Sequence, residues 1–236
     1  MSFASELLAA APATILAITL HEAAHGYAAL WLGDDTASRA GRLSLNPLRH
    51  VDPVGTVLLP AVLVLGQLLT LGRVEFMFGW AKPVPVDGMR LWRTPGGQVR
   101  VGMALVALAG PLMNFALALL AGLLLHGWDL VADSLSADSA DWGYRFLLLS
   151  ILANLVLGMF NLLPIPPLDG GRIAVGILPP PLAFRLAQLE RYGILIVLLL
   201  VFILPRLDSS LDPVGWLLRH VVAGGFQAVL AVTGNG

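Results

Sequence analysis

The sequence predicts an all-α integral membrane protein with about five to six hydrophobic helices, and three features of the chain indicate this. Of its 236 residues, 57% are hydrophobic and only 12% are charged, whereas an average soluble domain has roughly 25% charged residues. The apolar residues gather in several separate runs, each near the roughly 20 residues that cross a bilayer. A soluble fold of this length can bury one core but not several such runs. We therefore expect residues 1–236 to form a single multi-pass domain in a lipid bilayer.

The first apolar run, residues 7–32, is long enough to span a bilayer, and Gly33 marks its end. Residues 34–53 follow as a polar stretch with several turn-forming glycine and proline residues, which predicts a structured loop. The second run, residues 54–71, is interrupted by Pro60. It is followed by VEFMFGWAKPVPV, which is too short and too rich in proline for a spanning helix. We expect this piece to be extended.

The chain after residue 98 contains four further apolar runs. Residues 99–125 and 146–163 are separated by an acidic loop, as is typical of a helical hairpin. A fifth run lies near residues 186–204, and a weaker sixth lies near residues 213–232. These runs complete the predicted set of spans.

Charge argues against a nucleic-acid partner, and the lack of cysteine excludes a thiolate metal site. The formal net charge of -1 provides no basic surface for nucleic acid, so we expect no nucleic-acid partner. The chain has no cysteine. A metal ion would therefore have to be bound by histidine, aspartate or glutamate side chains.

A His-Glu-x-x-His pattern lies well inside the first apolar run, at His21, Glu22 and His25. Helix positions four apart share one face about 6 Å apart along the axis, so two imidazoles can bind one metal ion. Glu22 is one position further on and can reach a metal-bound water without ligating the metal. Ionisable residues inside a span are costly unless paired, which favours a functional site over a chance cluster. The pattern predicts His21 and His25 as metal ligands and Glu22 as a general base.

Catalytic zinc usually takes three protein ligands and keeps a fourth position for water, and two regions could supply the third ligand. Asp169 follows a proline-rich stretch at the end of the fourth run, where irregular backbone near membrane depth is tolerated beside protein or a water-filled cavity. The alternative is His50 with Asp52, which is nearer in sequence but lies in the polar loop. The residues by themselves leave both alternatives open.

Five motifs, in this order, resemble the site-2 protease family of intramembrane metalloproteases: HEAAHGYAA, NPLRHVDPVGT, GWAKPVPV, AGPLMNFALA and NLLPIPPLDGGRI. The closest similarity is to compact members without a PDZ domain. The resemblance covers a catalytic core of about residues 12–178 and leaves C-terminal helices at about residues 186–232. It implies one zinc ion per chain, with His21, His25 and Asp169 as ligands. It also implies that Glu22 is the catalytic acid and base.

The resemblance further implies a small membrane-associated β element that binds substrate as an added strand, which suits the extended piece. The expected substrate-binding residues are Phe78, Gly79, Trp80, Ala81, Lys82, Pro83 and Asn161. Asn114 matches a family asparagine thought to face the active site, where it would contact the oxyanion or the substrate. A hydrogen bond between helices is the other reading of Asn114. His50 matches a position to which we assign no role.

The distribution of basic residues sets an expected topology. Residues 73–100 and 166–191 are rich in arginine, which places both on the cytoplasmic side by the positive-inside rule. Because Asp169 lies at this side, the zinc site should lie in the inner half of the membrane, and the first helix should run from outside to inside. Residues 54–86 must then be re-entrant or lie along the inner leaflet. We expect the protein in the cytoplasmic membrane of a prokaryotic cell, with its active site toward the cytoplasm.

The expected activity is hydrolysis of a peptide bond within or beside a transmembrane segment, so the expected partners are a transmembrane protein substrate and the lipid bilayer. Two alternatives come from other functional classes. One is a membrane protein that transports or senses zinc, and the other is an inactive pseudoprotease that binds membrane helices. The sequence carries no signal for an oligomeric state.

Overall fold

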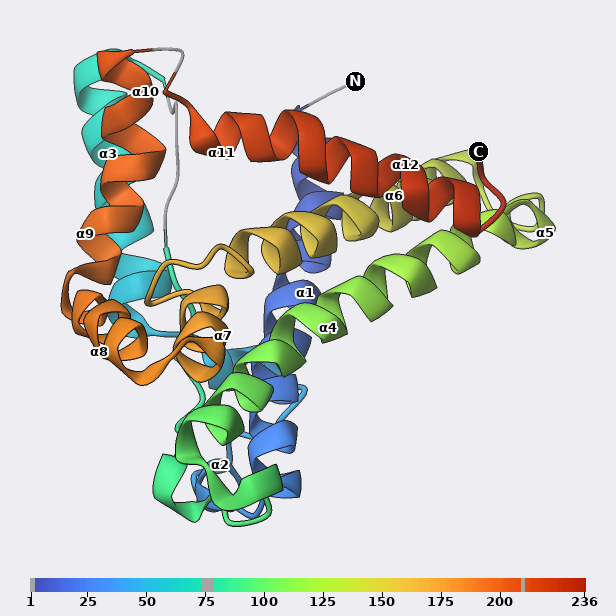
Figure 1. The fold of residues 1–236 in the computed structure, drawn as a ribbon. Coiled ribbons are helices and arrows are strands. Elements are labelled where there is room, and N and C mark those ends of the chain that lie inside the picture. The colour runs from blue at the N-terminus through green and yellow to red at the C-terminus, as the bar shows by residue number, and fades with distance from the viewer. Residues whose placement is uncertain (1–2, 74–78, 209–210) are drawn as a thin grey trace.

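The structure is a computed structural model that describes residues 3–73, 79–208 and 211–236, and it is built from helices (Figure 1). The described residues contain six helices that are long and apolar enough to cross a membrane: Glu6–Trp31, Pro53–Thr70, Val99–His126, Ala137–Asn161, Pro180–Leu207 and Pro213–Val232. The all-α membrane architecture is therefore confirmed. No strand is assigned in the described residues, so the expected β element is not seen in that form.

Three long helices and one short helix hold the centre of the molecule together. Helices α1 (Phe3–Trp31), α4 (Val99–His126) and α6 (Ala137–Asn161) pack against one another, and α7 (Asp169–Ile177) packs on α4. Proline is tolerated inside α1 and α4, as is common where neighbouring helices surround the backbone.

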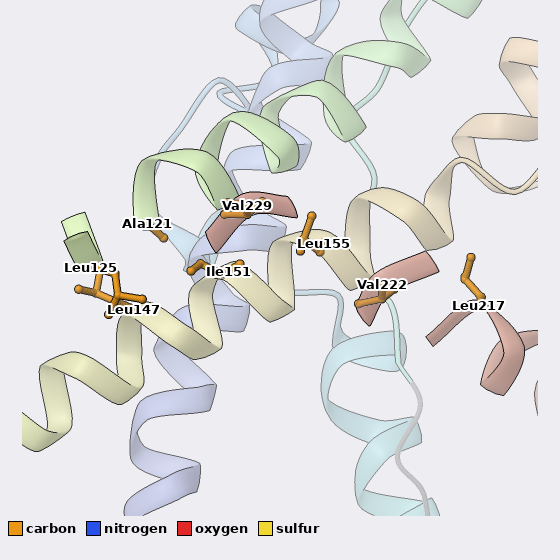
Figure 2. Close-up of a cluster of buried hydrophobic side chains, with 9 residues drawn as sticks. Ala121, Leu125, Leu147, Ile151, Leu155, Leu217, Val222 and Val229 are labelled. Atoms are coloured by element: carbon orange, nitrogen blue, oxygen red, sulfur yellow. The ribbon is translucent and has the colours of Figure 1, made fainter. Parts of the chain in front are cut away.

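The helix that begins with α11 (Pro213–Trp216) lies along α6 and covers it (Figure 1). It continues through η7 (Leu217–Val222) into α12 (Ala223–Val232). Figure 2 shows the apolar cluster that these helices share, and its buried members are Ala118, Ala121, Leu125, Leu147, Ile151, Leu155, Leu217, Val222 and Val229. Burial of these side chains supplies the packing between α4, α6 and the C-terminal helix.

Shorter elements make up the rest of the described chain. They are α2 (Thr36–Arg39), η1 (Pro47–His50), η2 (Pro53–Leu58), α3 (Leu59–Leu71), η3 (Gly88–Arg90), η4 (Pro95–Gly97), α5 (Asp129–Ala132), α8 (Pro180–Gln188), η5 (Leu189–Tyr192), α9 (Gly193–Leu198), η6 (Leu199–Ile203) and α10 (Leu204–Leu207). Several of them join end to end, so that the fifth candidate span runs from α8 to α10.

Helix α6 begins nine residues earlier than the apolar pattern predicts. Ser136 caps its N-terminus by accepting a hydrogen bond from the backbone N–H of Ser139, which satisfies one of the free donors of the first turn. Asp141 and Arg145 then form an ion pair one turn apart on the exposed helix surface. The expected acidic loop is therefore partly helical, because capping and charge pairing extend the helix beyond its apolar part.

Residues 53–71 leave the polar loop as a helix, and residues 79–87 lie back beside the start of that helix. Asp52 caps the helix formed by η2 and α3, and the extended residues 79–87 come back beside its start. The N–H of Lys82 donates to the carbonyl of His50 at 2.9 Å, and the N–H of Trp80 donates to the carbonyl of Gly55 at 3.1 Å. The start of this helix and residues 80–82 therefore lie side by side. That residues 54–86 are re-entrant or lie along the inner leaflet stays a prediction.

Asp34 follows the end of α1 and joins it to Asp87. It is fully buried, and its carboxylate accepts hydrogen bonds from the N–H and hydroxyl of Thr36 and from the N–H of Asp87. Burial by itself raises the pKa of a carboxyl group, but these hydrogen bonds outweigh it and hold the pKa of Asp34 below its ordinary value. The ionised carboxylate is therefore part of the folded structure.

The lowered pKa of Asp34 predicts a pH-dependent contribution to stability. This contribution is complete above the ordinary carboxyl pKa of about 3.9 and is lost as the pH falls through the lower pKa of the folded state. At neutral pH, Asp34→Asn places an NH₂ group against the N–H of Asp87 and should cost about 1–3 kcal/mol of unfolding free energy. Thermal unfolding of the detergent-solubilised protein, followed by tryptophan fluorescence at several pH values, measures both effects.

The matched control is Asp35→Asn, since Asp35 is a partly exposed neighbour that forms surface ion pairs with Arg39 and Arg90. Exposed pairs of this kind contribute roughly 0–1 kcal/mol. Equal melting temperatures of the Asp34 and Asp35 variants at neutral pH would contradict the prediction. So would a difference in melting temperature between the wild type and Asp34→Asn that persists below the pKa of the folded state.

Candidate metal centre

Three side chains from two helices converge on one buried point. His21 and His25 lie one turn apart on α1, and Asp169 is the first residue of α7. The Nε2 atoms of the two histidines are 3.1 Å apart. The Oδ2 atom of Asp169 lies 3.1 Å from Nε2 of His21 and 3.4 Å from Nε2 of His25. These residues form the one group of metal-binding side chains found within the described residues.

The geometry of this cluster fits zinc. Zinc lies about 2.0–2.2 Å from nitrogen and oxygen ligands, so tetrahedral ligands are about 3.3–3.5 Å from one another. The three observed separations are close to this range. Oδ2 of Asp169 is also buried and has no hydrogen-bond donor within the described part of the chain. A buried carboxylate oxygen without a donor, facing two imidazole nitrogens, is what a shared cation would stabilise.

Helix α4 orients both imidazole rings. The Nδ1–H of His25 donates to the backbone carbonyl of Val106 at 2.8 Å, and the Nδ1–H of His21 donates to Oδ1 of Asn114 at 2.6 Å. With the proton on Nδ1, the Nε2 lone pair of each ring is free and points toward the centre. Hydrogen bonds of this kind fix both the tautomer and the ring orientation of metal-binding histidines.

The segment before Asp169 brings the carboxylate to the centre. Residues 162–168 form a series of turns rather than a helix, as the prolines in NLLPIPPLDGG predict. Gly170 and Gly171 lie so close to the backbone of these turns that a Cβ atom on either would overlap it. The two glycines therefore let α7 begin directly beside the turns, with Asp169 in its first position.

Glu22 lies next to His21 and is held by the extended segment. Its Oε2 atom accepts a hydrogen bond from the backbone N–H of Val84 at 3.1 Å. Val84 itself is buried. One carboxylate oxygen of Glu22 is therefore tied to the protein, in a position that does not ligate the metal centre.

The alternative ligand pair in the polar loop does not join the cluster. The ring of His50 is buried, and its Nε2 atom lies 2.8 Å from the carbonyl of Ser44. Asp52 accepts hydrogen bonds from the N–H groups of Val54 and Gly55 and caps the following helix. The tertiary structure therefore brings Asp169, and not His50 or Asp52, to the histidine pair.

The two asparagines of the predicted site have different surroundings. Asn114 is fully buried, and its amide makes hydrogen bonds to His21, Ala17 and Asn154. It therefore links helices and orients the His21 ring, whereas an oxyanion or substrate contact stays a prediction. Asn161 is half-buried and donates to the carbonyl of Leu157 within its own helix.

Of the predicted substrate-binding segment, residues 79–83 follow the extended path beside Glu22. Phe78 lies outside the described residues. Trp80 and Lys82 have exposed side chains, and their backbone groups pair with the loop and helix that precede them. The arrangement places this segment next to the candidate centre through Val84 and Glu22.

Three residues of the site were missed by reasoning from the sequence: Val106, Gly110 and Asn154. Val106, Gly110 and Asn114 are spaced four apart and so lie on one face of α4, which is the pattern that could have identified the first two. A Cβ atom on Gly110 would lie 2.5 Å from the His25 ring and 2.6 Å from the His21 ring. Only glycine allows α4 to approach both histidines this closely.

Two histidines and an aspartate, buried where membrane-spanning helices meet, with a glutamate beside the first histidine, have the ligand chemistry of a zinc metallopeptidase. Comparison with known proteins agrees with this class, because the sequence model of Peptidase family M50 matches residues 126–204. The chain belongs to peptidase family M50, the site-2 protease family of zinc metalloproteases.

Several curated proteins are similar over most of the chain. The Bacillus subtilis protein named "Putative zinc metalloprotease YwhC" is 42% identical over 194 residues, which cover 81% of this chain and 78% of the relative. Two proteins described in the same way and named Rip2 are 34% identical in Mycolicibacterium smegmatis and 32% identical in Mycobacterium tuberculosis. These matches cover 82% and 83% of this chain and 66% of each relative. No solved structure matches the chain significantly.

The position of Gly110 predicts that even a methyl group at this site disrupts metal binding. In Gly110→Ala, the added Cβ must displace the His21 and His25 rings or push α4 away from α1. We expect the purified protein to retain less than about a tenth of the wild-type zinc, because outer contacts of metal ligands typically change affinity 10–100-fold. Elemental analysis after dialysis against trace zinc measures this.

Gly66→Ala is the matched control, because nothing lies within 4 Å of a Cβ atom at that helical position. It should bind zinc as the wild type does. Full zinc occupancy in Gly110→Ala would show that the packing of α4 on the histidines does not constrain the centre.

Proposed function

We propose that this chain is an intramembrane zinc endopeptidase that cleaves a peptide bond within or beside the transmembrane segment of a membrane protein. The observation that carries the proposal is the position of the centre. His21 and His25 lie inside the candidate span Glu6–Trp31, and Asp169 reaches them from α7. A peptide bond cleaved at such a centre must itself enter the helical bundle.

The proposed reaction assigns a role to each of these side chains. When bound, zinc supplies an activated water and polarises the scissile carbonyl. His21, His25 and Asp169 would hold the metal, and α4 would keep the two rings in place. Glu22 would take a proton from the attacking water and pass it to the amide nitrogen that leaves. The N–H of Val84 would keep the Glu22 carboxylate oriented during these transfers.

The extended segment offers a surface for the substrate backbone. A transmembrane helix hides its carbonyl groups in its own hydrogen bonds, so it must unwind locally before cleavage. A free strand edge can then pair with the released backbone groups. Residues 79–84 are not helical, and Val84 at their end donates to Glu22, which supports such an edge beside the proposed base.

One edge of this segment is already used by the protein. The N–H groups of Trp80, Lys82 and Val84 donate to Gly55, His50 and Glu22 respectively. The buried guanidinium of Arg42 donates to the carbonyl of Lys82, and Thr56 Oγ1 donates to that of Trp80. Alternate residues of an extended chain face opposite sides. Gly79 and Ala81 therefore present the other edge, which is the edge we assign to the substrate, whereas Pro83 has no N–H and its carbonyl lies 3.5 Å from Arg42.

The membrane side follows from charge. Residues 73–100 follow α3, residues 166–191 contain Asp169, and both stretches are rich in arginine. By the positive-inside rule, the proposed centre faces the cytoplasm. All three relatives come from bacteria, which supports the cytoplasmic membrane of a prokaryotic cell as the location.

The first test of the function is Glu22→Gln. The amide cannot accept the water proton, so cleavage should fall about 10²–10⁴-fold, whereas zinc content should match the wild type. Transmembrane proteins that accumulate in cells carrying this variant are the substrates to assay in proteoliposomes. Glu6→Gln is the control, because Glu6 is an exposed glutamate on the same helix.

Retained cleavage in Glu22→Gln would rule out the proposed mechanism. Zinc flux through wild-type proteoliposomes without cleavage would instead identify a transporter. A wild-type protein that captures membrane helices without cutting them would be a pseudoprotease.

The second test concerns the substrate edge. Within the described residues, the N–H of Ala81 makes no hydrogen bond to the protein. Ala81→Pro removes this donor in a segment whose extended backbone suits proline. One lost hydrogen bond of about 0.5–1.5 kcal/mol should raise KM about three- to tenfold without changing zinc content. Ala81→Ser keeps the donor and serves as the control, and equal KM values for the two variants would contradict the assignment.

A further inference from the structure

The two histidines of the centre are oriented in different ways. The Nδ1 atom of His25 faces the backbone carbonyl of Val106, which can only accept a hydrogen bond. The Nδ1 atom of His21 faces the side-chain amide of Asn114, which has an accepting oxygen on one side and a donating NH₂ group on the other. The orientation of that amide therefore has to be set by further contacts.

The orientation of Asn114 decides whether His21 can bind a metal. With Oδ1 toward the ring, His21 carries its proton on Nδ1 and presents a free lone pair on Nε2. With the amide reversed, the NH₂ group would require a lone pair on Nδ1, and the neutral ring would then carry its proton on Nε2. That proton would point at the centre and exclude the ion.

We propose that Asn154 of α6 is a positioning residue for zinc binding, which holds the Asn114 amide with its oxygen toward His21. Nδ2 of Asn114 donates to Oδ1 of Asn154 at 2.8 Å. This role concerns metal affinity and extends beyond the proposed peptidase reaction. It depends on the His21 centre and not on which substrate is cut.

The orientation of Asn154 is itself anchored by the backbone. Nδ2 of Asn154 donates to the carbonyl of Ser150 at 2.9 Å, one turn earlier on α6. Because that carbonyl can only accept, Asn154 must turn its oxygen toward Asn114. The direction of every hydrogen bond from Ser150 through Asn154 and Asn114 to His21 is therefore determined.

Burial makes this chain of hydrogen bonds hard to replace with water. Asn114 is 0% exposed and Asn154 is 3% exposed. The carbonyl of Ala17 is a second acceptor for Asn114, but at the longer distance of 3.3 Å. Loss of Asn154 should therefore weaken the orientation of Asn114 without abolishing it, since one weaker contact still favours the same direction.

The test measures the zinc affinity of the metal-free protein in detergent by competition with a chromophoric chelator. Asn154→Leu, similar in volume and unable to accept, should bind zinc about 10–100-fold more weakly than the wild type. Asn154→Asp keeps an oxygen toward Asn114 and should stay within about threefold of the wild type. Ser150→Ala is the control, because it removes the hydroxyl, which donates to Phe146, and leaves the Ser150 carbonyl in place.

A double-mutant cycle separates positioning from general loss of structure. If Asn154 acts through Asn114, Asn154→Leu should cause no further loss of zinc affinity in an Asn114→Leu background. Wild-type affinity in Asn154→Leu would overturn the proposal, as would an equal fold loss in both backgrounds. If Asn154→Leu fails to fold, Asn154→Ala replaces it, because it also removes the acceptor. A loss of about tenfold or more supports the role, and wild-type affinity overturns it.

The zinc measurement needs no substrate, so its outcome is independent of the proposed peptidase activity. Absence of cleavage with the expected zinc affinities would reject the function and leave the positioning role standing. Cleavage by the wild type, with wild-type zinc affinity in Asn154→Leu, would support the function and reject the positioning role.

Discussion

The hydrogen bonds from the Nδ1 atoms of His21 and His25 to helix α4 are the interactions on which the rest of the site depends. They fix the tautomer of both rings, and so they leave the Nε2 lone pairs of two helical histidines free for the proposed metal. They also require α1 and α4 to lie very close together. Gly110 permits that approach, since any side chain there would overlap the rings. The orientation of the two rings therefore depends directly on how closely α1 and α4 pack.

The hydrogen bond between His21 and Asn114 also explains why α6 belongs to the site although it contributes no proposed metal ligand. Its apolar face packs on α4 and the C-terminal helix, and this packing places Asn154 opposite Asn114. A buried amide without partners would be costly in a membrane interior. The polar chain from Ser150 to His21 satisfies each member in turn. Apolar packing thus determines where a small polar network can form.

Residues 79–84 join the polar loop to the proposed base, Glu22. One edge of the segment is held by the polar loop, through His50 and Arg42, and its Val84 N–H contacts Glu22. His50 therefore has a structural role: its carbonyl accepts a hydrogen bond from the N–H of Lys82, and its ring contacts the carbonyl of Ser44. The loop therefore positions the segment without taking part in metal binding.

The sequence by itself determined the spans, the histidine pair and the position of Glu22, because these follow from composition and from the fixed repeat of a helix. Spacing of four residues places His21 beside His25 in any α-helix. The residues by themselves left Asp169 and His50 both open, and the motif resemblance implied Asp169. The tertiary structure brought Asp169 to the histidine pair, assigned Asn114 to His21, and revealed Gly110 and Asn154. Those contacts join residues far apart in the chain, and they depend on how helices cross. No local periodicity encodes that crossing, since it results from the combined packing of several helices.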